Sequence, residues 1–524
     1  MLSFPRDVDV LAATVAVCVG GMASLYACRV RERCKAARIG HVHLVPTLIG
    51  GPVGWLLGHL PELQLGAEES GVSMTRHVRA VRDLHKRSCP EVNRDAVGVI
   101  FPGTTLGVAV LNPRDVEYVL LRNGSNYEKS ALYDSIIPLL GASSIVVLRD
   151  ESKHTVLRRQ LNPAFSAVAL QTVYDKVVAK HVQTQMLKLS AQLTDGIAAG
   201  VDVEHTYDAL ALDIVSEAAF RETSVETAGS DHSGSSTVSD YFRIMADTLL
   251  TSPYILVPGL SALPWPAKFR LESARDSLRA AARVIFARAI SPSHAAASDV
   301  NKLLVDYLAD AHLDPSTVAD NMTTVLLAGH ETSSTTLTWL SYLLAKHPDV
   351  QQSLFEELSA AVQIGGVPSL DTVRNLSHLH NCVREALRLY PPVTLLSRVA
   401  VQDDCLPHSG VVIPKGTEVI FYVYCLQRDP LIWGADADSF RPDRWNDPST
   451  MERVGLGGFL PFFLGKRNCI GKDFAMNELL ATTAVLVRRF KLEWTEGQPE
   501  PYRQEKLTMR PKVPIAISLR QRTE

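Results

Sequence analysis

The sequence contains no CxxC pair and no regular cysteine spacing, although it has 8 cysteines among its 524 residues. This pattern argues against a disulfide framework or a zinc cluster, and it indicates a reducing compartment. The net charge of −3 provides no basic excess, so we expect no nucleic-acid partner. Internal repeats and acidic tails are also missing. The hydrophobic fraction of 46% is nevertheless enough to bury a large core.

Long uncharged stretches are scarce, and only residues 10–28 form one that suits a bilayer. At ~1.5 Å per residue, a helix of this length nearly spans the ~30 Å hydrocarbon core. Acidic residues precede the stretch and basic residues follow it: Asp7 and Asp9, then Arg29, Arg31, Arg33, Lys35 and Arg38. This asymmetry predicts a lumenal segment at 1–9, a transmembrane anchor at 10–28 and a cytoplasmic body. The alternatives are a cleaved signal peptide, which requires basic residues before a shorter run, and a buried core helix.

Proline and glycine punctuate residues 29–62, which predicts a basic, turn-rich linker to one large domain at 63–524. Alternating valine and glycine predict a β-hairpin or two separate strands at 97–111. Helical patterns dominate afterwards and strands return after Val411, so we expect a mainly α fold with a smaller β portion. The other predicted helices are 116–121, 153–160, 209–220 and 271–290, and the predicted irregular segments are 223–240, 252–266 and 291–298.

A long helix is predicted to begin at Asp314-Pro315, because aspartate caps helices and proline suits the first helical position. The pattern continues to Lys346 and is apolar on every face in its middle, which is typical of a buried helix. Gly329 and the hydroxyl residues that follow it interrupt this apolar character. We expect a local distortion there, which would open a notch beside Glu331 and Thr332. The alternative is that the hydroxyls bond back to the helix backbone.

Two further sequence patterns are a pair of opposite charges among apolar residues and a cysteine between two glycines. Glu385 and Arg388 are three residues apart on a predicted helix among apolar neighbours, which predicts a buried ion pair. Gly465 and Gly471 bracket Cys469 in a tight loop, and a helical pattern at 473–489 follows directly. Free amide donors at the start of a helix favour a thiolate. Such a thiolate can serve as a nucleophile or as an axial metal ligand.

These patterns resemble the cytochrome P450 superfamily. Its haem-binding loop, FxxGxRxCxG, is matched at every defining position by Phe462, Gly465, Arg467, Cys469 and Gly471. Three other motifs of the family precede this loop in the order that is typical of the family. They are the oxygen-binding helix motif at 328–333, the ExxR motif at 385–388 and the PERF-type segment at 440–445. The resemblance extends from Pro46 to the C-terminus. It implies the cytochrome P450 fold, with residues 63–524 as the haem-thiolate catalytic domain.

The resemblance assigns haem b as the cofactor and Cys469 as its axial thiolate ligand, which favours cleavage of the O–O bond. Phe462 is expected to pack near the sulfur. The haem propionates are expected to pair with arginines, because a guanidinium fork fits a carboxylate. The residues with this implied role are Arg467, Arg398 and Arg158, with His154 as a further donor where the family more often has tryptophan.

The same resemblance implies that Glu385, Arg388 and Arg444 form a buried ion network that holds the segment on the haem side. It also implies that Glu331 and Thr332 deliver protons for oxygen activation. The expected reaction is monooxygenation, in which one oxygen atom enters the substrate and the other leaves as water. Electrons are expected from NADPH through a separate diflavin reductase, with cytochrome b5 as a further partner. The expected location is the endoplasmic reticulum membrane, with a single span.

By analogy with the family, mostly aliphatic residues at 131–145, 326–329, 393–396 and Leu507 line the substrate pocket, which suits a lipophilic substrate. Many fatty-acid terminal hydroxylases have glutamate where this chain has Ala328. We therefore expect a sterol or another fused-ring membrane lipid, with fatty-acid and xenobiotic hydroxylases as alternatives. A haem-thiolate isomerase or dehydratase needs no dioxygen, and a haem sensor or electron carrier needs no proton delivery. The presence of both Glu331 and Thr332 disfavours these classes.

Overall fold

The computed structural model describes residues 43–44, 96–100, 106–222, 241–242, 266–292, 302–495, 497–505 and 507–522. Their contacts group them into two compact units, and each unit is described by itself. The first unit takes its described residues from Met1–Glu128 and Ser397–Phe421, and the second takes most of the remainder. The irregular segments predicted at 223–240 and 252–266 lie almost wholly outside the described residues, as does most of the segment at 291–298.

A six-stranded sheet dominates the first unit, with the strand order β1-β2-β3-β9-β6-β4. Strands β2 and β3 pair antiparallel from Ala96↔Val110 to Ile100↔Leu106, which confirms the predicted hairpin. The pairs β1–β2 and β3–β9 are parallel. The strands are β1 (His43–Leu44), β2 (Ala96–Ile100), β3 (Leu106–Val110), β4 (Tyr127–Lys129), β6 (Leu395–Ala400) and β9 (Glu418–Tyr422), beside the helix α5 (Pro113–Glu117) and the small antiparallel pair β7 (Asp404–Cys405) and β8 (Val412–Ile413).

The second unit is mainly helical, as predicted. Its longer helices are α7 (Glu151–Leu161), α9 (Ala179–Ser190), α10 (Val203–Phe220), α14 (Pro266–Ala289), α17 (Pro315–Lys346), α18 (Pro348–Ala361), α20 (Ser377–Leu389) and α24 (Lys472–Arg489). Its shorter helices are α6 (Ile137–Leu140), α8 (Ala167–Val173), α16 (Leu304–Asp310), α19 (Leu370–Asn375), α21 (Val423–Leu426), α22 (Pro430–Trp433) and α23 (Pro448–Val454). Strand β10 (Phe490–Trp494) pairs antiparallel with β13 (Ala516–Gln521), β13 with β5 (Ile197–Asp202), and β11 (Arg503–Glu505) with β12 (Met509–Pro511).

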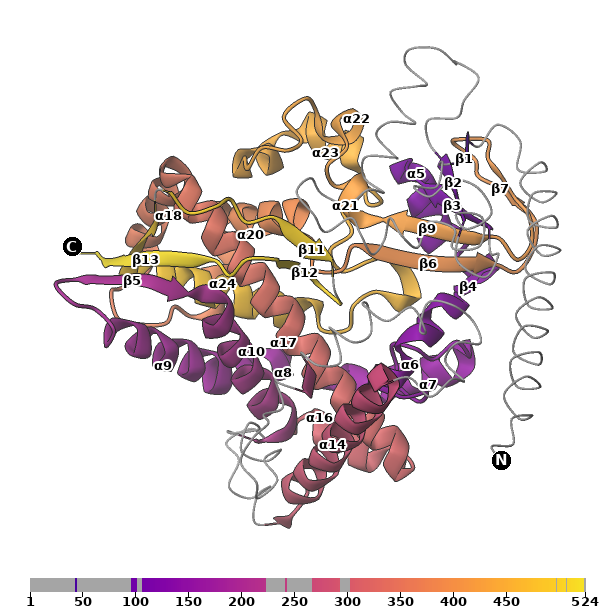
Figure 1. Cartoon of the computed structure of the whole chain (residues 1–524), viewed down its shortest axis with the longest axis horizontal. Helices are drawn as coiled ribbons and strands as arrows, with labels where there is room; N and C mark the ends of the chain where they lie inside the picture. Colours follow the sequence, from indigo (N-terminus) through magenta and orange to yellow (C-terminus); the bar gives the residue numbers. More distant parts are fainter. Residues whose placement is uncertain are drawn as a thin grey trace, which may run out of the picture. The chain divides into compact units, whose positions relative to one another are not determined.

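Helix α17 runs through the second unit and packs against α10, α14, α20 and α24 (Figure 1). It begins where the sequence predicts, because the Asp314 side chain accepts hydrogen bonds from the backbone N–H groups of Ser316 and Thr317. It also ends at the predicted Lys346, one residue before His347-Pro348. Its middle is buried on almost every face, so neighbouring helices determine its place more than solvent does.

The long helix stays α-helical through Gly329, so the predicted change of helical geometry is not observed there. Instead, hydroxyl groups bond back to carbonyl groups one turn earlier, Thr332 to Ala328, Thr336 to Thr332 and Thr338 to Ser334, each at 2.8 Å. Packing explains the glycine at position 329, because a Cβ there would lie 2.5 Å from Cγ2 of Val215 on α10. The glycine therefore permits the close approach of α10 and α17.

Among the described residues, no helix combines the length and apolar character needed to cross a bilayer. The predicted anchor at 10–28 and nearly all of the predicted linker at 29–62 lie outside those residues.

We predict that Gly329→Ala lowers the free energy of unfolding by up to ~2 kcal/mol, because overpacking costs about 1–3 kcal/mol and the gain in helix propensity is only about 1 kcal/mol. Denaturant unfolding of this variant, of Val215→Ala and of the double variant checks the prediction. The double variant should lose less than the sum of the two single losses, since Val215→Ala removes the clash. Additive losses would mean that the two side chains do not meet.

Candidate functional site

The loop around Cys469 is shaped by left-handed backbone and by one closing hydrogen bond. The backbone N–H of Cys469 donates to the carbonyl of Phe462 at 2.9 Å. Phe463 has φ 56° and Gly465 has φ 76°, a region that costs energy for any residue except glycine. Gly471 then caps α24. The predicted loop residues Phe462, Gly465, Cys469 and Gly471 therefore form one tight turn ahead of a helix.

Cys469 is an exposed residue. The protein atoms packed around its thiol nevertheless reduce its hydration, and this raises the pKa of the thiol above its usual value. The backbone N–H of Gly471 and the charge of Arg158 act in the opposite direction, because both favour the thiolate. The predicted amide donor is thus present, although burial has the larger effect. A metal ion that binds such a sulfur displaces its proton.

Helix α17 exposes one narrow strip in its otherwise buried middle. Ala328 is exposed, and Val325, Gly329 and Thr332 are partly exposed. Their spacing of three, four and seven residues places them on one face of the helix. Helix α17 also packs against α24, whose first turn follows Cys469. The second unit therefore provides an accessible sulfur and an accessible, mostly apolar helix strip with one hydroxyl.

The residues fit a haem-thiolate site on the chemistry of their donors. One accessible cysteine sulfur can bind iron, a small-residue strip can lie beside a flat apolar ring system, and Arg158 and Arg467 can pair with carboxylates. Cys382 and Cys425 are buried, and Cys382 has a pKa raised far above its usual value by burial. Within the described part of the second unit, Cys469 is thus the accessible thiol.

The predicted propionate partners have protein contacts in this structure. Arg158 donates from Nη1 to the carbonyl of Asn468 at 2.7 Å and from Nη2 to its Oδ1 at 2.6 Å. Arg467 donates to Glu151 at 2.8 Å and to the carbonyl of Leu148 at 2.8 Å. Both arginines therefore also fix the loop to α7 and to the segment before it.

His154 and Arg398 are both buried, but in different units. His154 lies on α7 one turn before Arg158, and both line a pocket of about 390 Å³ together with Thr155, Arg159, Asn162 and Lys466. Arg398 belongs to strand β6 in the first unit, where Nη1 donates to the carbonyl of Ser397 at 2.8 Å. Their predicted contacts with the haem remain predictions.

The acid and the alcohol of α17 have different surroundings. Thr332 lies on the accessible strip, and its hydroxyl donates to Ala328. Glu331 is only 6% exposed and has both oxygens engaged. Its Oε1 accepts from Thr508 Oγ1 and Arg510 Nε, both at 2.8 Å, and its Oε2 accepts from Arg510 Nη2 at 2.6 Å. The two predicted proton carriers are adjacent in sequence, but they do not touch the same groups.

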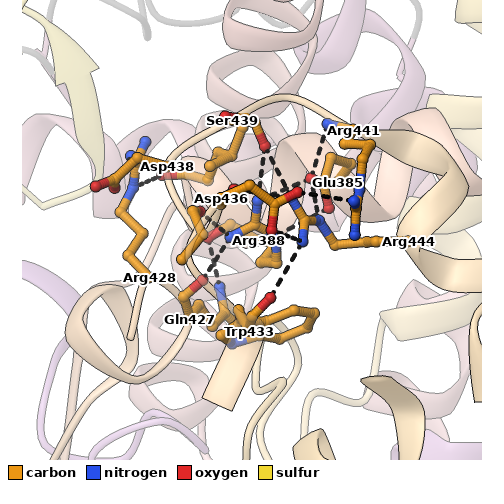
Figure 2. Close-up of polar contacts among 12 residues, drawn as sticks. Glu385, Arg388, Gln427, Arg428, Trp433, Asp436, Asp438, Ser439, Arg441 and Arg444 are labelled. Atoms are coloured by element: carbon orange, nitrogen blue, oxygen red, sulfur yellow. Dashed lines mark hydrogen bonds and ion pairs between the residues drawn. The ribbon is translucent and has the colours of Figure 1, made fainter. Parts of the chain in front are cut away.

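The predicted ion network is fully formed and almost fully buried (Figure 2). Glu385 accepts from Arg388 Nε at 2.8 Å and Nη2 at 2.7 Å, and from Arg444 Nε at 2.7 Å. The guanidinium groups of Arg388 and Arg444 also donate to backbone carbonyls, which are those of Gln427, Trp433, Asp436, Ala437 and Ser439. Each charge thus has several partners, which a buried ion pair needs to offset its desolvation.

Gln427 is a structural residue of this site that the sequence patterns did not indicate. It is fully buried, and its Nε2 donates to the carbonyls of Leu387 at 2.9 Å and Arg388 at 3.1 Å. Its Oε1 accepts from the backbone N–H of Leu460 at 2.8 Å. A single side chain therefore connects the end of α20 to the segment that leads into the cysteine loop. Glutamine in an apolar stretch offers no signal of such a role.

Glu478 is the second residue that the sequence patterns did not indicate. It lies on α24 with 0% exposure, and its Oε2 accepts from Ser333 Oγ at 2.8 Å. Its Oε1 has no hydrogen-bond partner among the described residues. Burial raises the pKa of Glu478 to about 8, against a smaller lowering effect of Ser333. At neutral pH this carboxyl group is therefore mostly protonated.

Comparisons with known proteins agree with the resemblance of the motifs. The sequence model of the family described as Cytochrome P450 matches residues 50–519. Cytochrome P450 CYP94D109 of Paris polyphylla is 26% identical over 80% of this chain and 87% of that protein. Cytochrome P450 monooxygenase himC of Aspergillus japonicus is 30% identical over 75% of this chain and 73% of that protein. A cytokinin hydroxylase of Arabidopsis thaliana is 35% identical over 40% of each chain.

We predict that Glu478 makes the protein less stable as the pH rises. Its pKa is about 8 when folded and near 4.3 when unfolded, so the folded state binds more protons between these values. The contribution of Glu478 to stability is complete below about pH 4.3 and falls by up to ~1.4 kcal/mol per pH unit until about pH 8. Glu478→Gln should therefore gain stability over the wild type at pH 8.5 compared with pH 6, in denaturant unfolding. A parallel pH dependence would contradict this assignment, and Glu356→Gln at an exposed site on α18 is the control.

Proposed function

The chain belongs to the cytochrome P450 family, and from this premise we propose that it binds haem b through Cys469 and inserts one oxygen atom of O2 into a lipophilic substrate. Members of the family are haem-thiolate monooxygenases, and this chain is an oxidoreductase of that kind. The observation that supports the assignment to Cys469 is its accessible thiol in a loop closed by the Phe462 carbonyl. When bound, the haem supplies the oxygen-activating chemistry.

The residues of the chain then orient, shield and supply protons. Cys469 would hold the iron of the bound haem, and the accessible strip of α17 would border the same site. Thr332 is the hydroxyl on that strip, so we assign it the last step of proton delivery, with Glu331 as the acid behind it. Arg158 and Arg467 are assigned to the propionates. The network of Glu385, Arg388 and Arg444 keeps the loop in place and takes no part in the chemistry.

The substrate is proposed to be a sterol or another fused-ring membrane lipid. Ala328, the exposed residue of the strip, leaves room beside the ring system and carries no charge. Val393, Leu395 and Leu507 are partly exposed apolar residues from other parts of the second unit. A mostly aliphatic lining favours a lipophilic molecule over a polar one. Spectral titration of the purified protein with sterols and with fatty acids tests the choice, and binding of fatty acids alone would overturn it.

Electrons are proposed to come from NADPH through a membrane-bound diflavin reductase, with cytochrome b5 as a second donor. The pocket near the cysteine loop supports this part, because Arg158, Arg159 and Lys466 give it a positive charge. A positive surface attracts an acidic partner and speeds association at low salt. We propose that the protein is held at the endoplasmic reticulum by the predicted anchor at 10–28.

We predict that the reduced protein with carbon monoxide shows the strongly red-shifted Soret absorption of a haem thiolate. Cys469→Ala should remove this absorption and the turnover, because Cys382 and Cys425, the other described cysteines of the second unit, are buried. Cys405→Ala is the matched control, since Cys405 is also accessible but lies in the first unit. Full turnover in Cys469→Ala would end the proposal.

We also predict that Thr332→Ala uncouples electron use from product formation. Product formed per NADPH consumed should fall by at least about tenfold, because a proton-transfer group contributes about a hundredfold or more. Hydrogen peroxide release should rise to match. Thr338→Ala is the control, since it removes an equivalent hydroxyl-to-carbonyl bond two turns away. Unchanged coupling in Thr332→Ala would contradict the role given to Thr332.

A further inference from the structure

Aromatic rings of the second unit form a continuous ring series, which consists of Trp494, Tyr342, Trp339 and Tyr390. The rings of Trp339 and Tyr390 are stacked, with their centroids 3.9 Å apart and an angle of 5° between their planes. Tyr342 meets Trp339 edge-on at 5.9 Å and Trp494 edge-on at 5.3 Å. Such stacked and edge-on arrangements are favourable contacts for aromatic pairs. Electrons pass readily between oxidisable rings that lie this close together.

The ring series leads from the accessible strip of α17 towards the surface. Trp339 follows Thr332 by seven residues, so it lies on the same face of the helix, about 10 Å further along the axis. Trp339 is fully buried, whereas Tyr342 and Trp494 are partly exposed. The Tyr342 hydroxyl donates at 2.5 Å to Glu500, whose side chain is 61% exposed. The inner rings are thus near the strip that borders the proposed haem site, and the outer ones reach solvent.

Trp339 and Tyr342 differ in what they can release when they are oxidised. The indole Nε1 of Trp339 donates to the backbone carbonyl of Met509 at 2.7 Å. A carbonyl is too weak a base to take the indole proton, so Trp339 can give up only an electron. The Tyr342 hydroxyl donates to the Glu500 carboxylate, which can take the phenol proton. Oxidised Tyr342 therefore becomes a neutral radical, which avoids the cost of a new charge in a partly buried place.

Nearby charges direct oxidation towards Tyr342. The guanidinium of Arg428 lies over the Tyr390 ring, 5.1 Å from its centroid. A cation is attracted to the electrons of an aromatic ring, so the removal of an electron from Tyr390 loses this attraction and adds repulsion. The Lys346 ammonium has the same effect on Trp494, at 5.6 Å from the centroid. Tyr342, with a carboxylate beside its hydroxyl, is therefore the ring that loses an electron most easily.

The pair of Tyr342 and Glu500 begins in the protonation states that this role requires. An ion pair with Lys346 and the hydrogen bond from Tyr342 hold the pKa of Glu500 below its usual value. Burial and the Glu500 carboxylate raise the pKa of Tyr342 above its usual value. The proton therefore stays on the phenol until the ring loses an electron, and it then moves to Glu500.

We propose that Trp339 and Tyr342 form an electron path by which a small reductant at the surface quenches the oxidant that hydrogen peroxide generates at the haem site when no substrate is bound. Each molecule of peroxide takes up two electrons and two protons and becomes two molecules of water. Trp339 and Tyr342 pass the electrons inward one at a time, and Glu500 holds the phenol proton meanwhile. Two molecules of a one-electron reductant such as ascorbate each lose one electron and one proton, and Tyr342 is restored.

The first test mixes the substrate-free, full-length holoprotein with hydrogen peroxide and records electron paramagnetic resonance spectra of rapidly frozen samples. The wild type should show a tyrosyl radical, and Tyr342→Phe and Trp339→Phe should each lose most of this signal. Tyr342→Phe keeps the packing of the ring, so it tests the path even if Trp339→Phe fails to fold. Tyr424→Phe is the matched control, because that ring lies beside Arg428 and outside the path. An undiminished signal in Tyr342→Phe would overturn the inference.

The second test removes the proton acceptor. Glu500→Gln keeps the shape of the side chain, but an amide cannot take the phenol proton, so formation of the radical should slow by at least about tenfold. Radical formation in the wild type should also be slower in heavy water, because the proton leaves together with the electron. Glu493→Gln, in the exposed pair with Arg520, is the control. Equal rates in Glu500→Gln and in the wild type would contradict the role of Glu500.

A third test measures protection of the protein. Hydrogen peroxide should bleach the Soret absorption of the substrate-free wild type, and ascorbate should slow this loss severalfold. Tyr342→Phe should be bleached at the same rate with and without ascorbate, because the reductant no longer has a path to the haem site. Mass spectrometry should find oxidation of Tyr342 in the wild type when ascorbate is absent. Equal protection by ascorbate in both proteins would show that the reductant reaches the haem site by another way, which would overturn the inference.

This inference rests on the proposed haem site at Cys469, and the carbon monoxide spectrum distinguishes the two failures. If the wild type lacks the spectrum of a haem thiolate, the proposed function fails, and the electron path fails with it. If every variant keeps that spectrum but Tyr342 carries no radical, only the electron path fails.

Discussion

The position of the Cys469 loop depends on the ion pairs that the buried Glu385 carboxylate makes with Arg388 and Arg444. Charges without solvent cost several kcal/mol each unless they are paired and hydrogen-bonded, so Glu385, Arg388 and Arg444 must assemble together or not at all. Their assembly closes the segment from Gln427 to Ser439 over α20, through the backbone carbonyls that the two guanidiniums bind. Gln427 then transmits this position to Leu460. The ion network therefore helps to position the segment before the cysteine loop through Gln427 and Leu460.

Helix α17 is the second element that arranges the site. Within one turn it places one residue on an accessible face and the next on a buried, charged face. Thr332 lies on the strip that neighbouring helices leave accessible, whereas Glu331 is held by Arg510 on the side of α10 and β12. A regular helix is enough for this division, since consecutive side chains leave it in different directions. Gly329 contributes by letting α10 approach closely. The same approach brings Glu204 and Asp208 of α10 to Arg510.

The buried acidic groups of the second unit differ in the number and charge of their hydrogen-bond partners. In the Glu385 network, Arg444 also pairs with the Asp436 carboxylate at 3.4 Å, so the two buried guanidiniums meet two carboxylates as well as several backbone carbonyls. At Arg510, one guanidinium binds three carboxylates, those of Glu204, Asp208 and Glu331, whose side chains are 21%, 24% and 8% exposed. Glu478 is a third case, a lone acid that burial keeps neutral.

The sequence alone was sufficient for the local elements and for the main candidates. Asp314-Pro315 marks the start of α17, the spacing of Glu385 and Arg388 predicts one helix face, and glycines on both sides of Cys469 indicate a tight loop; each of these depends on neighbours along the chain. Only the tertiary structure decided which groups those residues meet. Apart from Arg388, the partners of Glu331 and Glu385 come from segments about 60 to 180 residues away, such as Arg510 and Arg444. Long-range pairing of buried charges leaves no periodic pattern in a sequence, because it depends on how helices and strands pack and not on their spacing.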